Sequence, residues 1–470
     1  MSSVRAAPPL ATFYGDDFTG ASDNLAQFRR NGLRSVLFFE PPSPARLAAL
    51  AARGGAEVVG VAGVARSLPR AAMAAEIDPA IAALAPLGAP LFQYKCCSTF
   101  DSTPAIGSLG EAARRMMARW PQRPLAVLAA MPEFGRYTVF GNHFARHADD
   151  IYRLDRHPVM RSHPSTPMHE ADLGRILAEQ GLPAGAAVDI RAIDAAGDPA
   201  AGAPAAGGPA ALARSVDWQA GPVIFDACTE AQLVRAAGTI WEQAQAGDGM
   251  LALAAQGLAH GLGQYLQASG AVRQPPPAQT LPGVDRLLVL SGSCSSVTAR
   301  QIDTVEQMGW HVEALDPVGL LGGSADTEAL ADRLQRALAA CGGAVVHTAR
   351  GPDDPSVARV RAYIDEHAVE PQQLAARIGA GYAALIRAML RRGGLRRIVV
   401  AGGDSSGYTM RELGAWALEV VASAFVDNAH VCRLLADDPL VDGLEVLLKG
   451  GQVGRPTLFA SMREGFRPPR

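Results

Sequence analysis

The sequence predicts an α/β protein of two domains, each a mostly parallel β-sheet flanked by helices. Short apolar runs alternate with helical patterns along most of the 470 residues, as in chains that build parallel sheets. A proline-rich stretch at 273–283 interrupts this alternation and predicts a linker between domains at 1–272 and 284–470. Hydrophobic residues make up 49% and charged residues 19% of the chain, values that indicate a folded globular protein.

Charge and apolar runs argue against several classes of protein. The formal net charge is -3 and the pI is about 6.4, which provides no basic field for a nucleic-acid partner. No uncharged apolar run of about 18 residues predicts a membrane span, and residues 1–9 lack the apolar core of a signal peptide. We therefore expect a cytoplasmic protein without a membrane partner. The cysteines at 96, 97, 228, 294, 341 and 432 lack the spacing of a zinc site or disulfide framework, which predicts reduced thiols.

The first candidate site follows the first strand. This strand is expected to end at Tyr14, and the chain then passes through Asp16 and Asp17 into a helix expected at 21–30. The two acids therefore lie beyond the carboxyl end of a strand, where open α/β sheets bind ligands. Adjacent carboxylates favour a cation, a basic partner or a hydroxyl-rich ligand. An acidic helix cap explains the same pattern equally well.

Further elements of the first domain follow from apolar runs and alanine-rich helical patterns. Strands are expected at 33–40, 57–65, 91–94, 125–131, 187–193 and 223–227, and helices at 44–52, 230–246 and 252–265. Arg66 closes the third strand at the sheet edge expected for Asp16, where a guanidinium could clamp a carboxylate, although a surface ion pair is at least as common. The Ala/Gly/Pro-rich segment 195–213 predicts a mobile surface insertion.

Lysine is rare, since Lys95 and Lys449 are the two lysines among 43 basic residues. Lysine often meets phosphate or carboxylate as a point charge, but with two examples chance also explains the pattern. Lys95 leads into a segment that contains Ser98, Thr99 and Asp101. An ammonium, hydroxyls and a carboxylate are thus expected together at one strand end.

Two weaker patterns follow in the same half. A helix expected to open at 106–110 would favour an anion through its first N–H groups, with a Ser/Thr-rich turn as the alternative. The stretch 142–169 is predicted to be irregular, as lids and substrate loops often are. His143 and His147 have a spacing that could bind metal on a helix, but no third ligand has diagnostic spacing, so solvated or hydrogen-bonded histidines are favoured. The metal ligands therefore stay unknown.

The second half contains three strand–loop–helix junctions rich in small residues. They follow strands expected at 286–290, 397–401 and 444–448, and a helix at 408–418 is expected after the second. Small residues let the backbone approach a phosphate, and helix starts supply N–H donors. None of the loops is a P-loop or a GxGxxG fingerprint, which also disfavours a dinucleotide-dependent oxidoreductase. The candidate nucleotide-binding residues are Ser291, Ser293, Gly402, Gly403, Asp404, Ser405, Lys449, Gly450 and Gly451.

Five motifs in order resemble one known family. GDDFTGASD, YKCCSTFDST, SGSCS, AGGDSSG and LKGGQVG are similar to the motifs of the four-carbon acid sugar kinases, formerly a family of unknown function. The resemblance covers both halves of the chain. It implies an N-terminal sugar-acid domain, a C-terminal ATP domain and an active site in the cleft between them. It also implies ATP and Mg²⁺ as cofactors, phosphorylation of threonate, erythronate or a 3-oxo relative on the terminal hydroxyl, and a homodimer at the family level.

The resemblance also implies roles for individual residues. Asp16 and Asp17 fall on the acidic substrate motif, and one of them is expected to accept the hydroxyl proton. Arg66 and the stretch from Lys95 to Thr99 would line the sugar acid, and Asp101 lies in the same stretch. Many family members carry an arginine-bearing run where this chain has Ser-Thr-Phe-Asp-Ser at 98–102, so the identity of the substrate stays open. A kinase of a larger sugar acid and a binding protein without catalysis are the alternatives.

Overall fold

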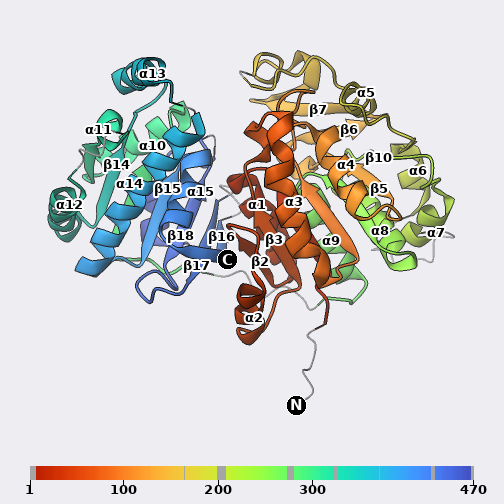
Figure 1. Ribbon diagram of the computed structural model, residues 1–470, viewed down its shortest axis with the longest axis horizontal. Coiled ribbons are helices and arrows are strands. Elements are labelled where there is room, and N and C mark those ends of the chain that lie inside the picture. Colours follow the sequence, from red (N-terminus) through yellow and green to blue (C-terminus); the bar gives the residue numbers. More distant parts are fainter. Residues whose placement is uncertain are drawn as a thin grey trace. The chain divides into compact units, whose positions relative to one another are not determined.

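The computed structural model describes residues 7–163, 165–197, 208–272, 280–321, 326–369, 371–424, 429–451 and 453–466, without the side chains at 321, 371, 372, 403–405 and 422–424. The chain divides into two compact units between Pro275 and Pro276. Residues 273–279 of the expected linker and 198–207 of the expected insertion lie outside the described residues. The prediction of an α/β protein with two mostly parallel, helix-flanked sheets is confirmed (Figure 1).

The first unit has a main sheet with the strand order β2-β3-β1-β4-β11-β5-β10-β9, and every described pairing within it is parallel. Its strands are β1 (Ala11–Gly15), β2 (Ser35–Phe38), β3 (Val58–Ala62), β4 (Leu91–Lys95), β5 (Leu125–Leu128), β9 (Ala186–Val188), β10 (Val223–Phe225) and β11 (Met250–Ala254). Its helices are α1 (Phe18–Arg30), α2 (Pro44–Ala52), α3 (Met73–Leu84), α4 (Leu109–Arg119), α5 (Leu173–Glu179), α6 (Ile190–Ala195), α7 (Gly208–Ser215), α8 (Glu230–Ala246) and α9 (Gly257–Ala268). The central strands are buried on both faces, which explains their continuous apolar runs.

Several elements of this unit differ from the sequence-based expectation. The strand expected at 187–193 ends at Val188, because the Asp189 side chain caps helix α6, which begins at Ile190. The described end of the insertion expected at 195–213 lies in helix α7. Helix α1 begins at Phe18 rather than at 21, because the Asp17 side chain caps it by accepting a hydrogen bond from Gly20 N. The expected helix at 252–265 is instead strand β11 followed by α9. The alanine-rich sequence favours a helix locally, but pairing between β4 and β5 places Met250–Ala254 in the sheet.

A small antiparallel sheet replaces the start of the irregular stretch expected at 142–169. It consists of β6 (Arg136–Val139), β7 (Asn142–His147) and β8 (Asp150–Arg153), drawn in orange and yellow in Figure 1. Bridges from Thr138 to Ala227 and from Met131 to Arg136 attach it to the rest of the unit. Many residues of β7 and β8 are polar or partly exposed. These strands therefore contain no apolar run from which the sequence could predict them. His143 and His147 therefore lie on a strand, not on a helix.

The second unit has the strand order β13-β14-β12-β15-β18-β17-β16, in which β17 runs antiparallel to its neighbours. Its strands are β12 (Leu287–Ser291), β13 (His311–Ala314), β14 (Gly343–His347), β15 (Arg397–Ala401), β16 (Ala415–Ala424), β17 (Ala429–Ala436) and β18 (Glu445–Lys449). Its helices are α10 (Ser296–Gln307), α11 (Pro317–Leu321), α12 (Thr327–Cys341), α13 (Pro355–His367), α14 (Pro371–Arg392), α15 (Gly403–Glu412) and α16 (Leu458–Glu464). The helix expected at 408–418 is wrong in its second half, since α15 ends at Glu412 and β16 follows.

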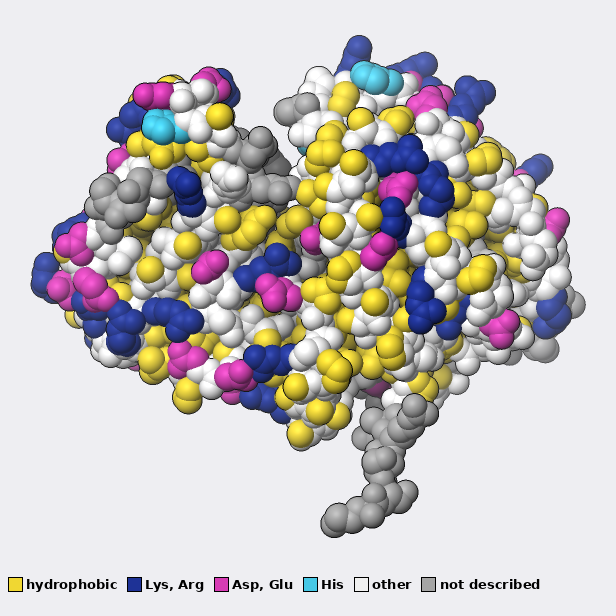
Figure 2. Space-filling model, in the orientation of Figure 1, with side chains coloured by type: hydrophobic (Ala, Val, Ile, Leu, Met, Phe, Trp, Pro, Cys, Tyr) yellow, Lys and Arg dark blue, Asp and Glu magenta, His cyan; other side chains and the backbone are white. Residues whose placement is uncertain are grey.

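Basic and acidic side chains are interspersed over the face drawn in Figure 2, in keeping with the small net charge of the chain. No helix among the described residues is long and apolar enough to cross a membrane.

Candidate active site

The carboxyl ends of β1, β3 and β4 bring the first group of predicted residues together. Gly15 is paired with Ala62 on one side and with Lys95 on the other. Beyond the strands, Asp16 N donates to the Lys95 carbonyl (3.1 Å) and Arg66 N donates to the Asp16 carbonyl (3.1 Å). These backbone bonds hold three segments that are distant in sequence at one sheet edge.

Arg66 binds both acidic side chains of the Asp-Asp motif. Its Nε and Nη2 lie 3.2 and 2.6 Å from the two carboxylate oxygens of Asp16, and its Nη1 pairs with Asp17. The Asp16 side chain is 1% exposed, whereas that of Asp17 is 18% exposed. The guanidinium is thus committed to the protein's own carboxylates, and Asp17 is the acid that solvent can reach.

The two carboxyl groups differ in their electrostatics. Burial raises the pKa of Asp16, and the nearby Asp17 charge adds to this rise, although Arg66 and Lys95 oppose it. Burial also acts to raise the pKa of Asp17, but Arg66, Lys95, Gly20 N and the Thr19 hydroxyl outweigh burial and lower it. As the N-cap of α1, Asp17 also lies at the positive end of the helix dipole. Asp17 is therefore held as a carboxylate near neutral pH.

Lys95 supplies a buried ammonium to the same edge. The residue is 2% exposed, and no hydrogen bond or ion pair joins its Nζ to any part of the chain that the structure describes. A Cβ placed on Gly20 would lie 2.1 Å from this Nζ and 3.0 Å from Asp17 Oδ1. The ammonium therefore packs against the first turn of α1, beside Asp17. A buried charge without an acceptor is costly, so this position suits an anionic group of a ligand.

The loop after β4 carries the other predicted substrate-binding residues. Cys97 Sγ lies 3.0 Å from Thr99 Oγ1, and Thr99 in turn donates to Asp101. The Ser98 carbonyl lies 2.8 Å from His143 Nε2, on β7. Burial raises the pKa of Cys97, and so does the nearby Asp101, which keeps the thiol neutral. The structure thus places Ser98, Thr99 and Asp101 in one loop directly after Lys95.

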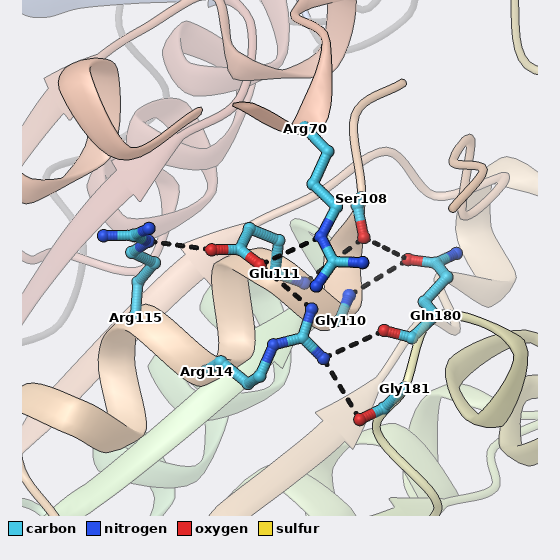
Figure 3. A network of polar contacts seen from close by, with 8 residues as sticks. All are labelled: Arg70, Ser108, Gly110, Glu111, Arg114, Arg115, Gln180 and Gly181. Carbon is cyan, nitrogen blue, oxygen red and sulfur yellow. Dashed lines mark hydrogen bonds and ion pairs between the residues drawn. The ribbon is translucent and has the colours of Figure 1, made fainter. Parts of the chain in front are cut away.

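The anion site expected at the start of α4 is wrong. Gly110 N donates to Gln180 Oε1 (3.0 Å) and Glu111 N donates to the Ser108 hydroxyl (3.3 Å), as Figure 3 shows. Ser108 also donates to Gln180. These N–H donors are satisfied within the protein. The arginines nearby, Arg70, Arg114 and Arg115, are paired with Glu111.

In the second unit, the ends of β12, β15 and β18 bring the glycine- and serine-rich loops together. Ser291 is paired with Ala401, and Ala401 with Lys449. Lys449 Nζ donates to Thr298 Oγ1 (2.8 Å) and to the carbonyls of Gly450 (3.0 Å) and Gly451 (3.3 Å). Lys449 is fully buried, and burial lowers its pKa to about 8. Its ammonium therefore connects the first turn of α10, which carries Thr298, with the loop that follows β18.

These loops pack closely against each other. A Cβ on Gly451 would lie 3.0 Å from Ser295 Cβ and 3.3 Å from Ser293 Oγ. Gly402 has a φ of 135°, which a side chain would strain, and its N–H donates to the Lys449 carbonyl (2.9 Å). Helix α15 starts directly afterwards at Gly403, and the side chains of Asp404 and Ser405 are not described. Small residues next to the starts of α10 and α15 would let the backbone N–H groups approach the phosphates of a nucleotide.

Sequence reasoning missed two buried residues that hold these loops. Gln301, one turn after Thr298 on α10, donates to the carbonyls of Val453, Gly454 and Arg455 at 3.0 to 3.1 Å. In the first unit, Gln180 contacts the loop after β4. Neither glutamine belongs to a motif, because its partners are distant in the chain. His143, which the sequence favoured as a solvated or hydrogen-bonded histidine, is hydrogen-bonded to the Ser98 carbonyl of the same loop. Among the described residues, no three His, Cys, Asp or Glu side chains are grouped so that they could hold a metal ion.

Both halves of the chain match models of known protein domains. Residues 11–262 match the model of a sugar-binding N-terminal domain, and residues 288–459 match that of a nucleotide-binding C-terminal domain. The chain belongs to the four-carbon acid sugar kinase family. It is 38% identical to a 3-oxo-isoapionate kinase of Paraburkholderia graminis, over 97% of this chain and 94% of that protein. It is 30% identical to a 3-oxo-tetronate kinase of Cupriavidus necator, over 97% of each.

A solved structure shows the same fold. The Haemophilus influenzae protein of the DUF1537 family has a TM-score of 0.69 and 22% identity, over 96% of this chain and 99% of that one. The resemblance noted in the sequence is confirmed, and with it the assignment to the sugar-acid kinases and the use of a nucleotide.

Proposed function

We propose that this protein transfers the γ-phosphoryl group of ATP to the terminal hydroxyl of a 3-oxo sugar acid, with 3-oxo-isoapionate as the first candidate. The observation that carries the choice is the 38% identity over 97% of the chain to the kinase named for that compound. Relatives named 3-oxo-tetronate kinase are 26 to 32% identical.

In the proposed reaction, the sugar acid lies against the first unit. Lys95 binds its carboxylate, because this ammonium has no acceptor of its own among the described residues, whereas Arg66 is paired with Asp16 and Asp17. The substrate hydroxyl attacks the γ-phosphorus, its proton passes to the reachable Asp17, and ADP leaves. A carboxylate of low pKa is sufficient, because such transfers depend mainly on positioning and charge stabilisation. Asp16, which is buried, keeps Arg66 in place.

ATP is proposed to lie on the loops of the second unit. The small residues that follow the neighbouring ends of β12, β15 and β18 support this placement. Lys449 acts indirectly, by holding Thr298 and the Gly450 carbonyl in place. Mg²⁺ would offset the charge of the phosphates, and it commonly binds through phosphate oxygens with one or two carboxylates rather than in a protein cage.

The test is ADP release from Mg·ATP with 3-oxo-isoapionate, 3-oxo-tetronate, threonate, erythronate and larger sugar acids, with the phosphorylated product identified by mass. We expect the highest kcat/KM for a 3-oxo acid. ATP binding without turnover of any of these acids would favour a binding protein and contradict the proposal. Turnover of threonate or erythronate alone would contradict the choice of a 3-oxo acid.

A further inference from the structure

The loop after β4 contains a strained residue at its centre. Phe100 has a φ of 57° although it is not glycine, and its side chain is fully buried. Such a conformation costs about 1–3 kcal/mol and persists only where the surroundings hold it. Thr99 and Asp101, two candidate substrate-binding residues, flank it directly. Whatever holds Phe100 therefore also orients their side chains.

One contact with this loop comes from the small antiparallel sheet. His143 Nε2 lies 2.8 Å from the Ser98 carbonyl and Nδ1 lies 3.0 Å from the Thr138 hydroxyl. A carbonyl only accepts, so Nε2 carries the proton and Nδ1 accepts from Thr138. Burial lowers the pKa of His143 to about 4, which keeps this neutral tautomer near pH 7. Two backbone hydrogen bonds hold the imidazole in place. Thr138 N donates to the Ala227 carbonyl (3.0 Å), and His143 N donates to the Ala171 carbonyl (2.8 Å).

A second contact lies on the other side of Phe100. Gln180 Nε2 donates to Ser102 Oγ (2.8 Å), and Ser102 Oγ donates to the Phe100 carbonyl (3.0 Å). The opposite end of the amide accepts from Gly110 N and Ser108 at the start of α4 (Figure 3). Gln180 is 2% exposed. The amide is therefore fixed in one orientation by partners on both ends.

We propose that His143 and Gln180 are positioning residues that hold the loop from Lys95 to Ser102 in its strained form and thereby set the affinity and selectivity for the sugar acid. Neither residue needs to touch the substrate. Both act on backbone or hydroxyl groups on either side of Phe100, so the loss of either contact lets Phe100 relax and moves Thr99 and Asp101. That the ligand is a sugar acid rests on the proposed function. That His143 and Gln180 hold the loop in place does not depend on it.

The first test compares His143→Phe with His143→Gln. Phenylalanine keeps a ring but has no donor for the Ser98 carbonyl, whereas glutamine offers an N–H near the position of Nε2. We expect His143→Phe to raise the KM for the sugar acid about 10- to 100-fold, the range that small displacements of positioning groups produce, with the KM for ATP unchanged. His143→Gln is expected to restore most of this loss. Equal changes in both KM values, or no rescue, would overturn the proposal.

Hydrogen exchange of the peptide 96–103 gives a readout that needs no activity. We expect faster exchange in this peptide in His143→Phe and in Gln180→Glu, which keeps the acceptor for Gly110 but loses the donor to Ser102. Gln232→Glu, at the cap of α8, is the matched control and is expected to leave the peptide unchanged. If His143→Phe does not fold, Gln180→Glu decides. Unchanged exchange in a folded variant would overturn the proposal even if the kinase activity is confirmed, and faster exchange would support the holding of the loop even if it is not.

Discussion

Substitution of Gly20 tests the placement of Lys95 without removing a charge. An added Cβ would lie 2.1 Å from Lys95 Nζ. Carbon and nitrogen atoms need about 3.5 Å, so the ammonium must move by about 1.4 Å. Nζ is the end of a flexible side chain, and the Asp17 carboxylate, 3.0 Å from the added Cβ, has to shift far less than the ammonium, so the backbone can stay in place.

The same substitution is expected to preserve the fold. Gly20 lies inside α1 and is not among the glycines with positive φ, so alanine fits its backbone conformation. Replacing a helical glycine by alanine contributes about 0.5–1 kcal/mol of stability. The variant therefore separates ligand geometry from stability: we expect a melting temperature equal to or above that of the wild type.

The expected cost in function follows from the displacement. A positioning error of about 1 Å can lower kcat/KM about 100-fold, equivalent to about 2.7 kcal/mol. The assay is steady-state ADP release by Gly20→Ala, Lys95→Met and the double variant. In the Lys95→Met background, Gly20→Ala is expected to change kcat/KM less than about 2-fold, because the displaced ammonium is already absent. A normal KM for the acid in Gly20→Ala, or fully multiplicative effects, would refute the reasoning.

Three further predictions address the base, the buried histidine and the nucleotide loops. Asp17→Asn is expected to lower kcat about 100-fold or more in a protein that still folds, since asparagine caps helices as well as aspartate, with a lower melting temperature because the ion pair with Arg66 is lost; full turnover would exclude Asp17 as the base. Because the pKa of His143 falls from the ordinary 6.5 to about 4, the unfolded state binds its proton first as pH falls. Its contribution to stability is complete above pH 6.5 and declines towards pH 4 by up to about 3 kcal/mol. Urea unfolding at pH 7 and 5 measures this loss, which His143→Gln should remove, and an identical loss in that variant would contradict the assignment. Thr298→Val deprives Lys449 of an acceptor and is expected to raise the KM for ATP about 10-fold; an equal rise in the KM for the acid would argue against a role confined to the nucleotide loops.

Local patterns were sufficient for much of the fold. Helices α2 (Pro44–Ala52) and α8 (Glu230–Ala246) have the bounds that their helical spacing and capping residues predict. Strand β11 and the start of β16 were missed because their sequences also fit helices, and sheet pairing decided their conformation.

The candidate site also has features that the sequence predicted and features that only the tertiary structure decided. The sequence by itself determined that Asp16 and Asp17 follow the end of one strand and that Lys95 lies at the end of another, because apolar runs and turn residues are properties of contiguous segments. Tertiary structure decided that Arg66 pairs with both acids and that Lys95 has no such partner among the described residues. It also decided that His143 contacts Ser98. Such pairings depend on the register between segments distant in the chain, which no local pattern contains.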